Sequence, residues 1–127
     1  MIEAILGVIK DEMNIIDVPY AFMRWTSSTT PERYWIGEYT QTTTETEDGY
    51  EEYNILLTGT TKNSWREMLQ DVAKIKEHFS PIGGLPKRTD KGVVVVYYDN
   101  SFPVPTGEAD LKRIQVNLRI KAWKGNN

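Results

Sequence analysis

Residues 64–80 read SWREMLQDVAKIKEHFS, and this stretch decides the fold that the sequence predicts. Its large apolar side chains recur at spacings of 3, 1, 3, 3 and 4 residues, which places them along one side of an α-helix. They are Trp65, Met68, Leu69, Val72, Ile75 and Phe79. Burying each such side chain contributes about 1.5 to 3 kcal/mol before entropy is subtracted. The helix is therefore expected to nucleate the core by covering a β-sheet.

Both ends of this helix carry sequence signals. Ser64 followed three residues later by Glu67 predicts a capping box, in which each side chain accepts a hydrogen bond from a free backbone N–H. Pro81 ends the helix, because proline has no N–H to donate. The glycines and prolines between Pro81 and Gly92 then predict a loop of roughly a dozen residues.

A second helix is predicted over residues 2–14. Its apolar stripe is Ile2, Ile5, Leu6, Ile9 and Met13, and its solvent side is expected to carry Glu3, Lys10 and Glu12. Pro19 prevents the helix from continuing. Residues 20–25 then favour a strand, and the polar stretch 27–32 favours a turn.

Two β-rich runs, 34–46 and 50–60, predict a long hairpin joined at Asp48-Gly49, a dipeptide that favours the type I′ turn. This loop places Ile55 opposite Thr42 and Leu57 opposite Thr40. The expected dry face holds Tyr53, Ile55, Leu57 and Ile36, and the expected wet face holds Glu45, Glu52, Thr43, Asn54 and Gln41.

Two further strands are expected near the C-terminus. Residues 93–98, VVVVYY, lack alternation, as in a strand that is covered on both faces or partly buried in an assembly. A proline-rich turn is predicted over 99–106. The last strand alternates strictly, with Ile114, Val116, Leu118, Ile120 and Ala122 facing in and Gln115, Asn117, Arg119, Lys121 and Trp123 facing out.

The predicted fold is a single α+β domain over residues 1–127. It has an antiparallel or mixed sheet of about five strands with a long β-hairpin, and two helices packed on one face. The order is α-β-β-β-α-β-β. A chain of 127 residues with 39% hydrophobic and 26% charged residues is typical of one globular domain.

Composition argues against several functions. The formal net charge of −3 disfavours a phosphate backbone as ligand, because nonspecific nucleic-acid binding requires clustered cations. No apolar run approaches the length of a membrane span, and the first residues lack the features of a signal peptide. The chain has no cysteine, which fits a protein used inside a cell.

Catalytic and metal motifs are not found in the sequence. His78 is the only histidine, no G-x-S-x-G accompanies it, and a solvated position in the last turn of a helix is favoured. Gly83-Gly84 matches no phosphate loop. The acidic residues Glu38, Glu45, Glu47, Asp48 and Glu52 lie along a hairpin tip, which is unlike a Mg²⁺ pocket. We expect no enzyme, no metal and no cofactor.

An assembly interface is the remaining kind of site. Tyr39 and Trp123 on a polar sheet face are typical interface anchors. The predicted hairpin register sets Glu45 against Glu52, and such like charges disfavour order in an isolated subunit. The tip could therefore bind basic residues of a neighbour, or it could be a solvated hairpin whose charges prevent edge aggregation. The candidate interface residues are Glu45, Glu47, Asp48, Glu51, Glu52, Lys87, Arg88, Tyr39 and Trp123.

The layout of the chain resembles small tail-terminator and head-to-tail joining proteins of long-tailed bacteriophages. The resemblance spans the N-terminal helix, the strand EEYNILLTG at 51–59, the capped helix and the last strand RIQVNLRIKAWK. It implies a structural virion protein that forms a ring, commonly hexameric, between the tail tube and the head connector. DNA would pass through the ring without specific binding. The alternative is a small cytoplasmic protein-binding module that acts as a monomer or dimer.

Overall fold

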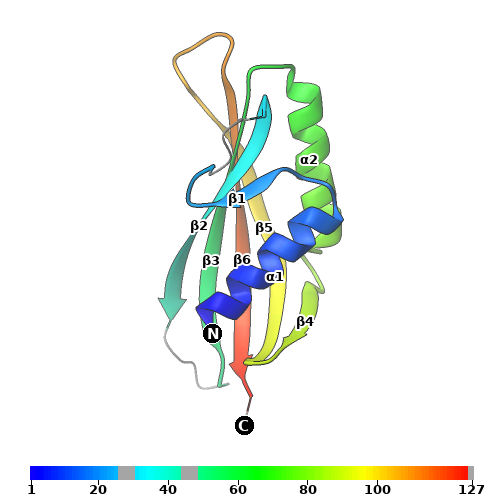
Figure 1. The fold of residues 1–127 in the computed structure, drawn as a ribbon, viewed down its shortest axis with the longest axis vertical. Coiled ribbons are helices and arrows are strands. Elements are labelled where there is room, and N and C mark those ends of the chain that lie inside the picture. The colour runs from blue at the N-terminus through cyan, green and yellow to red at the C-terminus, as the bar shows by residue number, and fades with distance from the viewer. Residues whose placement is uncertain (26–30, 44–48, 126–127) are drawn as a thin grey trace.

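Two helices and six strands follow one another in the computed structural model, which describes residues 1–25, 31–43 and 49–125. They are α1 (Ile2–Ile15), β1 (Tyr20–Phe22), β2 (Arg33–Thr43), β3 (Glu51–Thr61), α2 (Trp65–His78), β4 (Leu85–Thr89), β5 (Gly92–Val104) and β6 (Lys112–Lys124). The strands form one sheet in the order β1-β2-β3-β6-β5-β4 (Figure 1). β1 runs parallel to β2, and the other neighbours are antiparallel. The α+β class and the mixed sheet are as predicted, with a sixth strand added.

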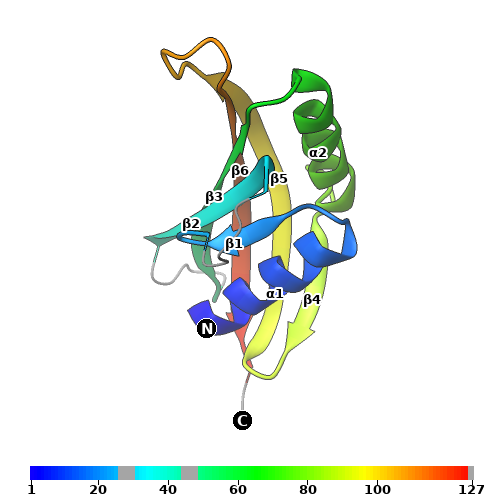
Figure 2. The ribbon, with the colours of Figure 1, turned by 45° about the horizontal axis from the view of Figure 1, so that its top comes forward.

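Both helices lie on one face of the sheet, which we call the inner face (Figures 1 and 2). One hydrophobic cluster joins Ile5, Ile9 and Met13 of α1 to Met68 and Ile75 of α2 and to the sheet. The inward residues predicted for β6 are all buried: Ile114, Val116, Leu118, Ile120 and Ala122. The predicted arrangement of two helices over one face of a sheet is therefore confirmed.

The predicted buried stripe of α2 is partly wrong. Trp65 is 38% exposed and Leu69 is 55% exposed, whereas Asp71 is only 1% exposed. The helix is rotated so that a carboxylate points inward, where donors from β2 reach it. Ser64 is the N-cap residue as predicted, but its side chain makes no capping bond. Glu67 instead accepts a hydrogen bond from Arg33, so the capping box is not formed.

The loop predicted after α2 contains a strand. β4 pairs with β5 from Leu85 opposite Val96 to Thr89 opposite Gly92. The Thr89 hydroxyl oxygen accepts hydrogen bonds from the backbone N–H groups of Lys91 and Gly92, each at 3.2 Å, which closes the turn. Gly92 has φ of +145° there, and a Cβ on it would lie 1.9 Å from the Trp123 carbonyl oxygen.

β5 is longer than predicted. It continues to Val104 through the stretch expected to be a proline-rich turn, and its register against β6 shifts between Tyr98 and Asn100. It also alternates. Val94, Val96 and Tyr98 are buried on the inner face, whereas Val93, Val95 and Tyr97 are only partly buried on the other face. Of the two expectations for this strand, cover on both faces is wrong within the described residues of one chain, and partial burial in an assembly stays a prediction.

The hairpin register also differs from the prediction. Ile55 lies opposite Tyr39 and Leu57 opposite Gly37, because β2 ends at Thr43 and β3 begins only at Glu51, with more residues between them than a two-residue turn has. Trp35 and Gly37, rather than Ile36, are therefore buried in β2. Gly59 stands opposite Trp35, and a Cβ there would lie 2.6 Å from the indole ring. Gln41 shares this inner face with Tyr53, contrary to the prediction.

β1 is shorter than the predicted strand over 20–25. It ends at Phe22, because Met23 adopts a positive φ of 66° that breaks the extended backbone. Residues 27–30 of the predicted turn and residues 44–48 of the predicted hairpin tip lie outside the described residues.

Candidate functional site

The sheet has a second face that neither helix covers, which we call the outer face (Figure 2). The strand register assigns it the side chains of Arg88, Val93, Val95, Tyr97, Gln115, Asn117, Arg119, Lys121, Trp123, Glu52, Asn54, Leu56, Thr58, Ile36 and Glu38. Most of them are partly buried or exposed rather than buried. The outer face is thus the largest surface of the sheet that remains available for a partner.

Aromatic rings and cations alternate on the outer face, toward the end of the sheet where β3 begins and β6 ends. The Arg119 guanidinium carbon lies 4.9 Å from the centroid of the Tyr97 ring. Lys121 Nζ lies 4.9 Å from the Tyr50 centroid and 5.9 Å from the Tyr97 centroid. The rings of Tyr50 and Trp123 pack at 5.2 Å. We call these five residues the cation–aromatic cluster. Such contacts hold long cationic side chains in place without neutralising them.

Positive charge exceeds negative charge on this face. Arg88, Arg119 and Lys121 form no ion pair with a carboxylate of the described residues. Glu52 stands across from Lys121 in the register, yet no ion pair joins them. A cationic, aromatic surface on a chain of net charge −3 suits an acidic protein surface.

The residues predicted to form an interface are distributed over both faces. Trp123, Arg88 and Glu52 lie on the outer face. Tyr39 is on the inner face of β2, 44% exposed, with its ring stacked on Phe22 at 6.2 Å. Glu45, Glu47 and Asp48 lie outside the described residues. The structure therefore brings three of the nine predicted residues to one surface.

Glu51 is held by residues of its own chain. It is 8% exposed and accepts hydrogen bonds from the Tyr53 hydroxyl and from Gln41 Nε2, the latter at 3.2 Å. Lys124 Nζ lies 2.8 Å from its other oxygen. The hydrogen bond from Lys124 has the largest effect and that from Tyr53 the next. Together they hold the pKa of Glu51 below its usual value. Burial and the nearby carboxylate raise the pKa of Tyr53 to about 12.

Lys87 also has an internal partner. Its Nζ lies 3.5 Å from Glu12 Oε1, and His78 Nε2 lies 2.9 Å from the same oxygen. Glu12 is only 4% exposed, so its predicted place on the solvent side of the helix is wrong. The predicted solvated position of His78 is also wrong, because its ring contacts the buried Glu12 and its side chain is only 23% exposed. This cluster joins α1, α2 and β4, and it holds the layers of the fold together.

Sequence reasoning missed the cation–aromatic cluster as a unit. The strict alternation of β6 correctly placed Arg119 and Lys121 on the outside. Their contacts with Tyr97 and Tyr50 depend on the register between β5 and β6 and on the chain path before β3, and neither can be read from periodicity. The signal that the sequence holds is Trp123, which follows the outward Lys121 by two residues on the same strand, so that both side chains share one face.

Two strand edges are also open. β1 pairs only with Trp35–Gly37 of β2, and β4 pairs with β5 only as far as Val96. On that same side of β5, after Val96, the Tyr98 N–H donates a hydrogen bond to the Phe79 carbonyl oxygen at 2.7 Å. Residues 38–40 of β2, on the side away from β3, and residues 99–104 of β5, on the side away from β6, therefore have no strand partner among the described residues.

Comparisons with known proteins add no assignment. No protein-family model matches the chain, and no curated protein matches it in sequence. Within the described residues, no helix combines the length and the apolar run needed to cross a bilayer. In the same part of the chain, no three acidic or histidine side chains gather as metal ligands would.

Proposed function

We propose that this protein is a structural assembly subunit of a bacteriophage or prophage virion, a tail terminator or head–tail joining protein that forms a ring at the head–tail junction. The observation that carries the proposal is the pair of open strand edges at opposite sides of one sheet. The layout of the chain that resembles this group of proteins supports the phage context. In this proposal the subunit has no catalytic role.

The two open edges are complementary in position. The open part of β2 lies toward the end of the sheet where β5 begins, and the open part of β5 lies toward the end where β2 begins. Because β2, β3, β6 and β5 are successive neighbours in the sheet and each pair is antiparallel, β2 and β5 run in opposite directions. The open edge of β5 in one copy can therefore receive β2 of a second copy in an antiparallel pairing, staggered so that β1 and β4 do not collide.

Such a contact joins two different surfaces of the same chain. A heterologous contact repeats from copy to copy and produces a closed ring when its rotation closes. The ring would contact the tail-tube protein on one side and the head connector on the other, in the virion and, during assembly, in the host cytoplasm. Because every subunit would use both edges, no subunit in the ring would keep an open edge prone to aggregation.

Cysteine cross-linking tests this contact directly, because the natural chain has no cysteine. Thr40→Cys lies on the open part of β2, and Asn100→Cys lies on the open part of β5; both positions are exposed. A flexible bismaleimide tolerates small errors in register. The double variant is expected to give a ladder of covalent oligomers that ends at the ring size, as seen in a denaturing gel.

The single variants are the matched controls. In a heterologous contact, neither Thr40→Cys nor Asn100→Cys alone brings two cysteines together, so each should remain uncross-linked. A covalent dimer from one single variant would indicate an isologous contact and contradict the ring. A double variant that stays monomeric at high concentration, also after addition of tail tubes, would contradict the proposal as a whole.

A second candidate is a small protein-binding module that works as a monomer or dimer. The cation–aromatic cluster favours it, because this surface can recognise an acidic protein without any ring. Light scattering over a concentration series separates the two candidates, since only the assembly subunit gains mass stepwise up to a closed ring.

A further inference from the structure

Exposed apolar side chains gather at the two open strand edges. Among the described residues, eight large apolar side chains are more than a third exposed. Six of the eight flank these edges: Phe22, Met23 and Tyr39 at β2, and Trp65, Leu69 and Phe102 at β5. Grouped apolar side chains of this kind mark protein–protein contacts, whereas singly scattered ones need no explanation. The grouping therefore indicates that another polypeptide covers these edges.

The exposed apolar pair on α2 faces the β5 edge. Asp71 holds its side of the helix against β2. Lys76 Nζ lies 5.8 Å from the centroid of the Tyr98 ring of β5. Leu69 precedes Lys76 by two helical turns, and Trp65 precedes Leu69 by one turn more, so all three lie on one side of the helix. In the sheet order β2-β3-β6-β5, this side of α2 faces away from β2 and toward β5. We call Trp65 and Leu69 the α2 ridge.

α2 runs along the same part of the sheet as the open edge of β5 (Figures 1 and 2). The hydrogen bond from the Tyr98 N–H to the Phe79 carbonyl places the C-terminal end of the helix level with the start of this edge. The register places the end of β3, from which α2 follows, level with Val104. The 14 helical residues and the strand residues 98–104 each cover about 20 Å. The α2 ridge, in the first half of the helix, therefore lies beside residues 99–104.

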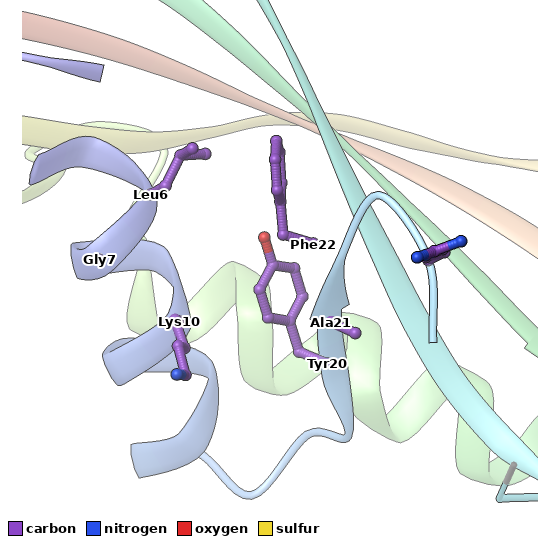
Figure 3. A pocket seen from close by; sticks show the side chains of 7 residues that line it. Leu6, Gly7, Lys10, Tyr20, Ala21 and Phe22 are labelled. Atoms are coloured by element: carbon purple, nitrogen blue, oxygen red, sulfur yellow. The ribbon is translucent and has the colours of Figure 1, made fainter. Parts of the chain in front are cut away.

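The open edge of β2 presents an apolar surface on the same face of the sheet. Phe22 and Tyr39 lie on the inner face, and their rings stack at 6.2 Å. Met23, directly after β1, is 58% exposed. Phe22 also lines an open pocket of about 380 Å³ between α1 and β1, together with Leu6 (Figure 3). The apolar surface therefore continues from β2 toward α1. We call Phe22, Met23 and Tyr39 the β2 apolar edge.

Continuation of the sheet from one copy to the next brings these two surfaces together. When β2 of a second copy pairs antiparallel with β5 of the first, both copies of β2 run in the same direction. The inner faces of the two copies then lie on the same side. Residues 38–40 of the second copy meet residues 99–104 of the first, which is the part of β5 that the α2 ridge accompanies.

We propose, on the basis of the ring contact proposed above, that the α2 ridge of one copy docks on the β2 apolar edge of the next copy. The contact buries Trp65 and Leu69 against Phe22, Met23 and Tyr39. Aromatic side chains of this kind are typical anchors of protein interfaces. The occupant of each surface is thus a second copy of the chain, and the side chains on the inner face supply apolar burial beside the paired strands.

Sedimentation velocity over a concentration series tests the docking. Leu69→Glu places a charge in the contact and should raise the concentration at half-assembly by about tenfold or more. Leu69 is 55% exposed, so the subunit should remain folded, as urea melts would verify. Gln70→Glu is the matched control, because it changes net charge equally at the neighbouring exposed position, on another side of the helix. It should assemble like wild type.

Mixing two variants tests whether the two surfaces meet each other. Tyr39→Glu disrupts the β2 apolar edge but keeps the α2 ridge, and Leu69→Glu does the reverse. At a concentration where neither variant assembles alone, an equimolar mixture has one intact combination of surfaces. Because a heterologous contact uses a different surface on each copy, the mixture should form dimers and nothing larger.

Three results would overturn the docking. Equal assembly of Leu69→Glu and Gln70→Glu, with wild type still forming rings, would reject the docking and leave the ring contact standing. A mixture that remains monomeric would show that the α2 ridge and the β2 apolar edge do not meet. A wild type that stays monomeric at high concentration, also with tail tubes added, would reject the ring and the docking together.

Discussion

Asp71 shows how a single carboxylate can orient a helix. Its Oδ2 accepts a hydrogen bond from Trp35 Nε1 at 2.9 Å and from Arg33 Nε at 2.7 Å. Both donors come from β2, so one atom ties α2 to a strand 36 residues earlier in the chain. A buried carboxylate without partners would be strongly destabilising. The bonds to Arg33 and Trp35 therefore account for its presence in the core.

Removing this carboxylate should destabilise the fold. Asp71→Ala leaves the Trp35 N–H unpaired in the core and deprives Arg33 of its buried partner, and the expected loss is about 2 to 4 kcal/mol. Urea unfolding followed by tryptophan fluorescence measures it. Glu67→Gln removes the charge of the exposed partner of the same arginine and should cost about 0.5 kcal/mol. Similar losses in the two variants would contradict the role given to Asp71.

Glu51 makes stability depend on pH in the acidic range. Its pKa is lowered from an ordinary value of 4.5, so its contribution is complete above about pH 4.5 and is lost as pH falls through the lower folded-state value. Wild type should therefore exceed Glu51→Gln in stability by a constant amount at neutral pH, and the difference should shrink below pH 4.5. Urea melts of both proteins from pH 3 to 7 provide the comparison; a difference that stays constant throughout contradicts the assignment.

At the scale of elements, the spacing of apolar residues correctly predicted which side chains are buried wherever apolar packing alone decides burial. The buried stripe of β6 follows its period, and Ile5, Ile9 and Met13 of α1 are buried as predicted, although Glu12 is also drawn inward by His78 and Lys87. In α2 the same reasoning selected Leu69 over Asp71, since a pattern of apolar residues cannot anticipate a carboxylate drawn inward by Arg33 and Trp35. The hairpin register and β4 failed for a related reason. Both depend on partners distant in sequence, and turn signals do not specify those partners.

The orientation of α2 leads to a paired prediction. Ile75→Ala should cost about 2 to 5 kcal/mol, because Ile75 is fully buried and its loss leaves a cavity. Leu69→Ala should cost less than about 1 kcal/mol, because this side chain is 55% exposed. Ile75→Ala and Leu69→Ala remove side chains of similar volume from the same helix. The difference between their free energies of unfolding, measured in urea melts, therefore reports which side of the helix faces the sheet. Equal losses would contradict the observed rotation.

The outer face and the chain as a whole carry net charges of opposite sign. On the described outer face, Arg88, Arg119 and Lys121 lack carboxylate partners, although the chain as a whole carries a net charge of −3. Glu38 and Glu52 are the carboxylates that the register places on this face, so its described side chains carry a net positive charge, opposite in sign to that of the whole chain. Such a distribution orients an approaching charged partner before contact is made. The same difference in charge would orient subunits or partners that carry acidic surfaces, whichever proposed function holds.

This difference in charge predicts that the outer face binds an acidic polypeptide. Poly-L-glutamate should change the fluorescence of Trp123, which packs beside Tyr50 in the cation–aromatic cluster, and the affinity should fall steeply between 50 and 300 mM salt as screening increases.

The combined replacement Arg119→Gln and Lys121→Gln should weaken binding by about tenfold. Its cost in stability should be about 1 to 2 kcal/mol, the worth of the cation–aromatic contacts that Arg119 and Lys121 make. The control, Lys62→Gln with Lys74→Gln, changes net charge equally but leaves the outer face intact, so it should bind almost as well as wild type. Equal weakening in both double variants would mean that net charge alone attracts the polymer, and the outer face would lose its claim as the binding surface.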